Sequence, residues 1–244
     1  DGLAGRLGDH ELLGILGRGG MGAVYKAIHT PTGAQRALKV LAPGGTIDVA
    51  RFKREAESMA AVGGHPNVLR IHTAGEAAGI LWYAMDVAEG GSLEGRLVSG
   101  PLPPLEVARL GAALARGLAH VHGHGVLHRD LKPANVLFDA AGTPMIVDFG
   151  LAAVEGSERL TETGVVVGTP LYMAPEQVTG DRAAIGPATD VYGLGAVLYE
   201  AATGHPPVDG TSSIEVMTRV VHAAPIPLRE HVPATPRSLE AVVL

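Results

Sequence analysis

Apolar and polar residues alternate in short runs near the start of the chain, and turns rich in glycine separate the runs. An alternation with a period of two predicts strands, here at residues 12–15, 23–27 and 36–41. Residues 48–62 change to an apolar stripe at helical spacing, with Asp48 as the expected N-cap. The first part of the chain is therefore expected to form a sheet with one helix.

Helical patterns dominate the rest of the chain. Two more strands are predicted at residues 68–73 and 80–87, and a polar hinge follows at 89–92. The clearest later helices are expected at residues 107–121 and 191–200. We therefore expect an α+β fold of two lobes, a strand-rich one at about 1–88 and a larger helical one at about 89–244. A cleft between two lobes is a common ligand site.

Composition narrows the classes of function. The 244 residues carry 19 Lys and Arg against 25 Asp and Glu, a net charge of −6, which argues against nucleic acid as a partner. There is no cysteine, which excludes disulfides and thiolate chemistry. No apolar run reaches the ~18 residues that a membrane span needs. The chain starts at Asp1 and stops within a helical pattern, so we expect a longer parent protein.

A glycine loop spans Gly17 to Gly22 and fits the pattern G-x-G-x-x-G. In a dinucleotide-binding fold the last glycine opens a helix, and an acidic residue follows about 20 residues later. Here the next residues continue as a strand, and Lys39 lies near that acidic position. The loop is therefore interpreted as a hairpin tip whose bare backbone approaches phosphates, with a plain flexible turn as the alternative.

Lys39 and Glu55 form a candidate pair. The alternation places Lys39 on the side of its strand that also carries Ala37 and Leu41. Glu55 lies inside the apolar stripe of the first helix, where a carboxylate is costly unless it is paired. We expect Glu55 to pair with Lys39 and to aim the ammonium group at a phosphate. A surface pair with Arg51, four residues earlier, is the alternative.

Residues 128–150 read His-Arg-Asp-Leu-Lys-Pro-Ala-Asn, then two short apolar runs around a turn, then Asp-Phe-Gly. The apolar runs predict a hairpin. If Val136 faces Val147, then Asn135 faces Asp148 at one end of the hairpin, with Asp130 five residues before Asn135. Carboxylate and amide oxygens suit Mg²⁺ bound together with substrate phosphates.

These motifs resemble the catalytic domain of eukaryotic-type Ser/Thr protein kinases, most closely those of bacteria. The glycine loop, the Lys39 strand, His-Arg-Asp, Asp-Phe-Gly and Ala-Pro-Glu at 174–176 follow in family order, over about residues 10–244. The resemblance implies a two-lobed kinase fold that transfers the γ-phosphate of ATP to protein Ser/Thr hydroxyls with the help of Mg²⁺. It also implies that the last helices of the larger lobe lie beyond residue 244.

The resemblance assigns roles to individual residues. Asp130 would accept the proton of the substrate hydroxyl, Lys132 would contact the γ-phosphate, and Asn135 and Asp148 would hold Mg²⁺. Met85 would be the gatekeeper, and Met59, Ile71, His128 and Phe149 would stack as a regulatory spine. The residues expected to bind ATP are Leu16, Gly17, Arg18, Gly19, Gly20, Met21, Gly22, Ala23, Val24, Ala37, Lys39, Glu55, Met85, Asp86, Ala88 and Leu137.

Other residues receive structural or regulatory roles. Asp190 is expected to cap the helix at 191–200 and, by resemblance, to brace the loop at 128–129. Glu176 is expected to be a buried carboxylate without its family partner, at a cost in stability. Thr169 matches the family threonine near Asp130. Thr161 and Thr163 are the expected sites of activating phosphorylation by another copy of the kinase. Arg129, which is expected to be buried beside Asp130, is the cation expected to bind the phosphate.

Other functions stay open at this point. A pseudokinase scaffold would lack Lys39, Asp130 or Asp148, and a small-molecule phosphotransferase would not be expected to carry the segment at 168–176. Four histidines at positions 120, 122, 124 and 128 suggest zinc, but glycines interrupt the helix there. The partners expected are protein substrates. The kinase domain is expected in the cytoplasm, in a parent protein that a further segment anchors to a membrane.

Overall fold

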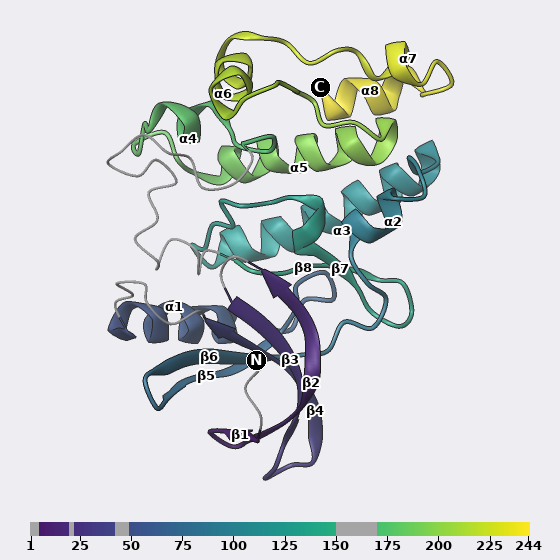
Figure 1. Cartoon of the computed structure of the whole chain (residues 1–244). Coiled ribbons are helices and arrows are strands. Elements are labelled where there is room, and N and C mark those ends of the chain that lie inside the picture. The colour runs from purple at the N-terminus through teal and green to yellow at the C-terminus, as the bar shows by residue number, and fades with distance from the viewer. Residues whose placement is uncertain (1–4, 20–21, 42–48, 150–169) are drawn as a thin grey trace.

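The computed structural model describes residues 5–19, 22–41, 49–149 and 170–244, and within residues 49–62 it leaves out the side chains of 49–51, 53, 55, 58 and 61. The smaller lobe is one antiparallel sheet with strand order β1-β2-β3-β4-β6-β5 and helix α1 beside it (Figure 1). Its elements are β1 (Arg6–Leu7), β2 (His10–Gly19), β3 (Gly22–His29), β4 (Ala34–Leu41), α1 (Val49–Val62), β5 (Ile71–Ala77) and β6 (Ile80–Met85).

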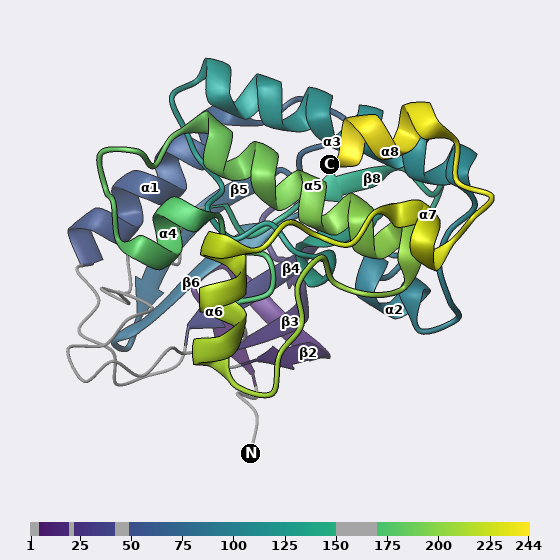
Figure 2. The same ribbon diagram turned by 90° about the horizontal axis from the view of Figure 1, so that it is seen from above.

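The larger lobe is mainly helical, and Figure 2 shows α3 and α5 side by side within it. Its helices are α2 (Leu93–Leu97), α3 (Pro104–Gly123), α4 (Pro175–Thr179), α5 (Pro187–Thr203), α6 (Ser213–His222), α7 (Leu228–His231) and α8 (Arg237–Val243). A 3-10 turn (Pro133–Asn135) leads into a small hairpin of β7 (Val136–Phe138) and β8 (Pro144–Ile146). In the part of the chain that the structure describes, no helix is both long and apolar enough to cross a membrane.

The alternation in β4 explains why the sheet has two different faces. Leu38 and Val40 pack in a cluster on one face. Ala37 and Leu41 point to the other face, where they join Phe52 and the other buried residues of α1 in the main core. Lys39 shares this second face because side chains alternate along a strand. The strands predicted at residues 12–15, 23–27 and 36–41 and the first helix are confirmed, while the expected N-cap Asp48 lies outside the described residues.

One strand begins later than predicted. Residues 68–69 do not extend β5 but pair with the larger lobe. The Leu69 N–H donates to the carbonyl of Ile146 at 3.0 Å, and the Ile146 N–H donates to the carbonyl of Asn67 at 3.0 Å. The segment that follows α1 is thereby tied to β8, and the sheet starts only at Ile71.

The β7–β8 hairpin has a register one residue away from the predicted one. Val136 pairs with Ile146, not with Val147, and Leu137 pairs with Met145. The turn decides this register. The Asp139 side chain accepts from the Thr143 N–H at 2.7 Å, and Gly142 adopts a φ of 84° that suits glycine. The backbone N–H of Val147 now donates to Asn135, which lies directly before β7.

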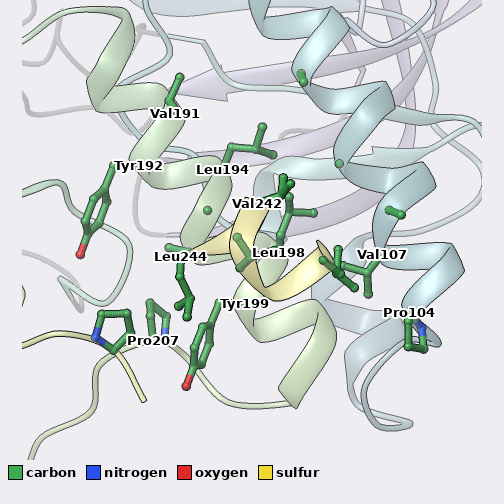
Figure 3. Close-up of a pocket in the computed structure, with 18 of the residues that line it drawn as sticks. Pro104, Val107, Val191, Tyr192, Leu194, Leu198, Tyr199, Pro207, Val242 and Leu244 are labelled. Carbon is green, nitrogen blue, oxygen red and sulfur yellow. The ribbon is translucent and has the colours of Figure 1, made fainter. Parts of the chain in front are cut away.

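Helices α3, α5 and α8 border an apolar groove of about 1190 Å³ (Figure 3). Val107 contributes from α3, Leu198 and Tyr199 from α5, and Val242 from α8. All of its lining residues belong to the larger lobe. This groove is therefore separate from the contact between the lobes, where Lys39 of β4 meets Asp148.

Candidate active site

The glycine loop is the tip of the β2–β3 hairpin. Gly17 pairs with Val24, Arg18 with Ala23, and Gly19 with Gly22, so the predicted hairpin is confirmed. A Cβ added at Gly17 or Gly19 would meet no atom within 4 Å. The backbone of these glycines faces open space, as a phosphate-covering loop requires. Leu16 is exposed just before the loop, while Gly20 and Met21 lie outside the described residues.

Lys39 of the smaller lobe forms an ion pair with Asp148 of the larger lobe. The ammonium Nζ lies 2.6 Å from Oδ2 of Asp148, and the hydroxyl of Tyr83 donates to Oδ1 at 2.6 Å. The side chains of Glu55 and Arg51 are outside the described residues. The expected Lys39–Glu55 pair and its alternative therefore both stay predictions. Nothing in the sequence marks Tyr83 as a site residue, because it lies in a run of buried strand residues.

Asp148 remains ionised despite its position. Burial by itself raises the pKa of this carboxyl, but the Lys39 ammonium and the Tyr83 hydroxyl together lower the pKa below its ordinary value. Asp148 also has a φ of 62°, a left-handed conformation that aspartate tolerates better than most residues. The site thus holds a carboxylate ready to accept a cation at neutral pH.

Asp130, Lys132 and Asn135 form a second group. Nζ of Lys132 lies 3.0 Å from Oδ2 of Asp130. The amide nitrogen of Asn135 donates to the backbone carbonyl of Asp130 at 2.8 Å. The amide oxygen of Asn135 is an acceptor and has the chemistry of a cation ligand. The loop after His128 therefore gathers a carboxylate, an ammonium group and an amide within a few residues.

The residues expected around the adenine belong to one cluster. Ala37 and Met85 are buried there, and Val24, Ala88 and Leu137 pack against the cluster while remaining partly accessible. Asp86 differs, because its carboxylate is held by His72 at 2.6 Å and by Arg36 at 3.8 Å. The backbone N–H of Asp86 also donates to the carbonyl of Arg70 at 3.1 Å. If Asp86 contacts the nucleotide as expected, its backbone carbonyl is the group with the suitable chemistry.

His128 organises the catalytic loop from inside the core. Its Nε2 donates to the carbonyl of Val147 at 2.8 Å, and its Nδ1 accepts from the N–H of Asp130 at 3.1 Å. This pattern requires the neutral ring, in which one nitrogen donates and the other accepts. The ring also stacks edge-on against Phe149, and Met59 and Ile71 are buried in the same core as Phe149.

Asp190 fixes the backbone of the same loop through its carboxylate. It is 1% exposed, and its carboxylate accepts from the backbone N–H of His128 at 2.8 Å and of Arg129 at 2.7 Å. Nε2 of His122 lies 2.7 Å from the same carboxylate. The predicted capping role is wrong. Asp190 lies in the first turn of α5, and its carboxylate is used by the catalytic loop, which is the contact that the resemblance implies.

Two further expectations need correction. Glu176 is neither fully buried nor unpaired, because the Thr189 hydroxyl donates to its carboxylate at 2.6 Å. The side chain of Arg129 is exposed, not buried as expected beside Asp130. Its backbone has a φ of 65° and is fixed at its carbonyl by Gln177. Thr161, Thr163 and Thr169 lie outside the described residues.

The other histidines near the site have contacts of their own. His120 on α3 reaches the carbonyl of Val62 at the end of α1, at 2.8 Å, and His124 contacts the carbonyl of His120. Within the described ranges, no group of three or more His, Cys, Asp or Glu side chains could hold a metal ion. The zinc site considered at the four histidines therefore has no support there, and the Mg²⁺ site expected at Asn135 and Asp148 stays a prediction.

We expect the free energy of unfolding to fall as the pH drops below about 6.5. Burial lowers the pKa of His128, His10 and His65, so the fold holds them neutral. Each gains its proton more readily when unfolded. Their contribution is therefore complete above the unfolded pKa and is lost as the pH falls towards the folded pKa. Thermal melts at a series of pH values measure this.

His128→Gln should weaken that pH dependence, because it removes one of these three histidine rings and the one that lies deepest in the core. His222→Gln changes an exposed histidine and is the matched control. A melting temperature that stays constant on acidification from neutral pH to about pH 5.5 would contradict the expectation.

Comparison with known proteins shows which protein family this chain resembles. A family model described as "Protein kinase domain" matches residues 10–240. The DNA damage-responsive serine/threonine-protein kinase RqkA of Deinococcus radiodurans is 41% identical over 99% of this chain and 36% of its own length. Serine/threonine-protein kinase PrkC of Bacillus subtilis is 34% identical over 97% of this chain and 37% of its own length. The chain thus spans about a third of the length of these relatives.

A solved structure shows the same arrangement of elements. The kinase domain of Mycobacterium tuberculosis PknI matches with a TM-score of 0.77 and 30% identity, over 100% of this chain and 89% of that chain. The two-lobed α+β fold expected from the sequence is confirmed. From the motif order, the contacts of the motif residues and these matches, we conclude that the chain belongs to the protein kinase family.

Proposed function

We propose that this chain transfers the γ-phosphate of ATP to serine and threonine hydroxyls of protein substrates. The observation that carries the proposal is the arrangement in the cleft. Lys39 and Asp148 lie in contact across the lobes, and Asp130 contacts Lys132 on the same catalytic loop. The Ser/Thr kinases RqkA and PrkC, similar over nearly the whole chain, support it.

Asp130 acts as the base in this proposal. Its carboxylate accepts the proton of the attacking hydroxyl as the hydroxyl oxygen bonds to the γ-phosphorus. The bond between the γ-phosphorus and the oxygen that bridges it to the β-phosphate breaks, and ADP leaves with that oxygen. Lys132, whose ammonium lies 3.0 Å from this carboxylate, supplies positive charge beside the transferred group. Asn135 fixes the loop through its bond to the Asp130 carbonyl. The residues position the reactants and balance charge, and they form no covalent intermediate with the phosphate.

ATP and Mg²⁺ are the proposed cofactors. The oxygens of Asn135 and Asp148 fit Mg²⁺, which prefers hard oxygen ligands and shares its coordination with phosphates. When bound, Mg²⁺ neutralises charge on the β- and γ-phosphates. Lys39 binds the α- and β-phosphates, and the apolar cluster around Ala37 and Met85 accommodates the adenine.

The proposal is tested by incubating the purified chain with labelled ATP, Mg²⁺ and a generic basic protein. We expect label on the protein with the wild type and almost none with Asp130→Asn. Nucleotide binding without transfer by the wild type would favour a scaffold. Transfer only to small molecules would favour a small-molecule phosphotransferase.

We also propose that phosphorylation of Thr161 or Thr163 activates the kinase, carried out by a second copy of it. A phosphate orders a segment only where a cation is available. Arg129 precedes Asp130, its side chain is exposed, and in the described ranges no carboxylate contacts its guanidinium. A phosphate group on Thr161 or Thr163 that binds the Arg129 guanidinium would link this segment directly to the catalytic loop.

We expect the Thr161→Ala/Thr163→Ala double variant to lose most of its activity and its ability to accept phosphate. Mass spectrometry after incubation with ATP identifies the modified residues, and the rate of self-modification should rise with the square of enzyme concentration. Ser157→Ala, in the same segment, is the matched control. Full activity of the double variant, with no phosphate on either threonine in the wild type, would refute the switch.

The cytoplasm is the proposed location of the kinase domain, because ATP and Mg²⁺ are available there. Protein substrates are the proposed partners, and a membrane anchor in the parent protein stays a prediction. The sequence of the parent beyond Leu244 tests it, since an anchor requires a run of about 20 apolar residues.

A further inference from the structure

Tyr83 and Lys39 each contact one oxygen of the Asp148 carboxylate. The two residues are direct partners in neighbouring antiparallel strands, with Lys39 on β4 paired to Tyr83 on β6. Directly opposed residues project from the same face of a sheet. Nζ of Lys39 contacts Oδ2 of Asp148 and the Tyr83 hydroxyl donates to Oδ1, both at 2.6 Å. The sheet of the smaller lobe thus holds both oxygens of one carboxylate in the larger lobe.

The position of the Tyr83 hydroxyl is well defined by its surroundings. The side chain is 1% exposed and lies in the main core, where its ring packs against Phe52 of α1 with centroids 6.4 Å apart. The ammonium of Lys39 lies 5.9 Å from the ring centroid. A tyrosine fixed at its ring has little freedom left except rotation of the O–H bond, so the donor is aimed before any ligand arrives.

The two donors have different fates when a nucleotide binds. Lys39 is the residue proposed to contact the α- and β-phosphates, and that contact competes with its bond to Oδ2 of Asp148. Tyr83 is buried in the core, and it is not among the residues proposed to contact the nucleotide. Once Lys39 turns to the phosphates, Oδ2 becomes available to a cation and the Tyr83 bond to Oδ1 remains.

We propose that Tyr83 is a positioning residue that keeps the Asp148 carboxylate oriented for the metal ion after Lys39 has moved to the nucleotide. The inference rests on the proposed role of Asp148 as a metal ligand. Hydrogen bonds to ligating carboxylates fix their orientation, and removing such a bond typically costs about 10–100-fold in metal affinity or activity. A side chain that served only to fill the core would leave metal affinity unchanged when its hydroxyl is removed.

Tyr83→Phe tests this, because it keeps the ring and removes only the donor. Mn²⁺ binding is measured by electron paramagnetic resonance of the free ion, with a non-hydrolysable ATP analogue present, so that no phosphate transfer is needed. We expect the Kd for Mn²⁺ to rise about 10-fold. In steady-state assays, KM for Mg²⁺ should rise by a similar factor, while kcat at saturating Mg²⁺ changes much less.

Tyr199→Phe is the matched control. Tyr199 is also buried, and its hydroxyl donates to the carbonyl of Ile226 at 2.7 Å, within the larger lobe. The Tyr199→Phe variant should bind Mn²⁺ with the Kd of the wild type. If Tyr83→Phe does not fold, as judged by thermal melting, Tyr83→Met removes the donor with an adaptable apolar side chain and is measured in its place.

Asp148→Asn separates this inference from the proposed function. If Asp148→Asn weakens Mn²⁺ binding strongly but folded Tyr83→Phe binds within about twofold of wild type, the role of Tyr83 is refuted and that of Asp148 stands. If Asp148→Asn also binds Mn²⁺ like the wild type, the metal role of Asp148 fails, and the role of Tyr83 fails with it.

Discussion

Asp130→Asn should lower the rate of phosphoryl transfer by on the order of 10²–10⁴-fold, the usual contribution of a positioned base. The amide has nearly the same shape as the carboxylate but cannot take up the proton of the attacking hydroxyl. The backbone carbonyl of Asp130, which accepts from Asn135, is unchanged by this substitution. The fold should therefore be retained, and the loss should appear in kcat rather than in the KM for ATP.

Initial rates at saturating ATP and Mg²⁺, with thermal melts of the same preparations, measure the effect. Asp209→Asn is the matched control, because its side chain is 82% exposed and pairs with Arg219 on the surface. Near-normal transfer by a folded Asp130→Asn variant would show that Asp130 is not the base.

Asp190→Ala should cost about 2–6 kcal/mol of stability, since each buried donor left without a partner costs about 1–3 kcal/mol. The N–H groups of His128 and Arg129 would both lose their acceptor. Arg129 also has a left-handed φ of 65°, which persists only where the surroundings enforce it. Because Asp130 follows Arg129 directly, the activity should fall together with the stability.

Thermal melts and transfer rates measured on the same variant check this prediction. A domain of this size loses about 2–4 °C per kcal/mol, so the melting temperature should drop by roughly 5–20 °C. Asp181→Ala, an exposed aspartate at a turn, is the matched control. Lost activity at an unchanged melting temperature would instead give Asp190 a direct chemical role.

The parts of the site that were predictable from the sequence are those encoded by local pattern. The alternation in β4 placed Lys39 on the face of Ala37 and Leu41, and the strand after Gly22 identified a hairpin tip. Both features depend on the rules of one strand or one turn. The chemical types of Asp130, Asn135 and Asp148 predict a cation and phosphates without any knowledge of the fold, and this part stays a prediction.

Contacts between distant segments were not predictable in this way. The Tyr83–Asp148 bond joins residues 65 positions apart, and nothing in a buried run of strand residues marks a tyrosine as a donor to a distant carboxylate. Thr189 similarly reaches Glu176 from another helix. The contact of His122 with Asp190 likewise joins residues 68 positions apart, and no local pattern predicts it.

The register of the β7–β8 hairpin was predicted one residue away because the geometry of its turn was not considered. Pairing Val136 with Val147 matched two apolar residues, but it gave no weight to the turn. The three-residue loop closed by Asp139 and Thr143 sets the register one residue away. Ile146 and Val147 are both buried in the structure, so burial does not favour one register over the other. The geometry of the turn therefore decides which of them pairs with Val136.

The central claim is that this cleft transfers the γ-phosphate of ATP to serine or threonine hydroxyls. The most direct measurement is phosphoamino-acid analysis of a basic protein incubated with the chain, Mg²⁺ and ATP labelled at either the γ- or the α-phosphate. We predict label from γ-labelled ATP on phosphoserine or phosphothreonine, none from α-labelled ATP, and none with Asp130→Asn. Label from α-labelled ATP, label on tyrosine alone, or undiminished transfer by Asp130→Asn would contradict the account.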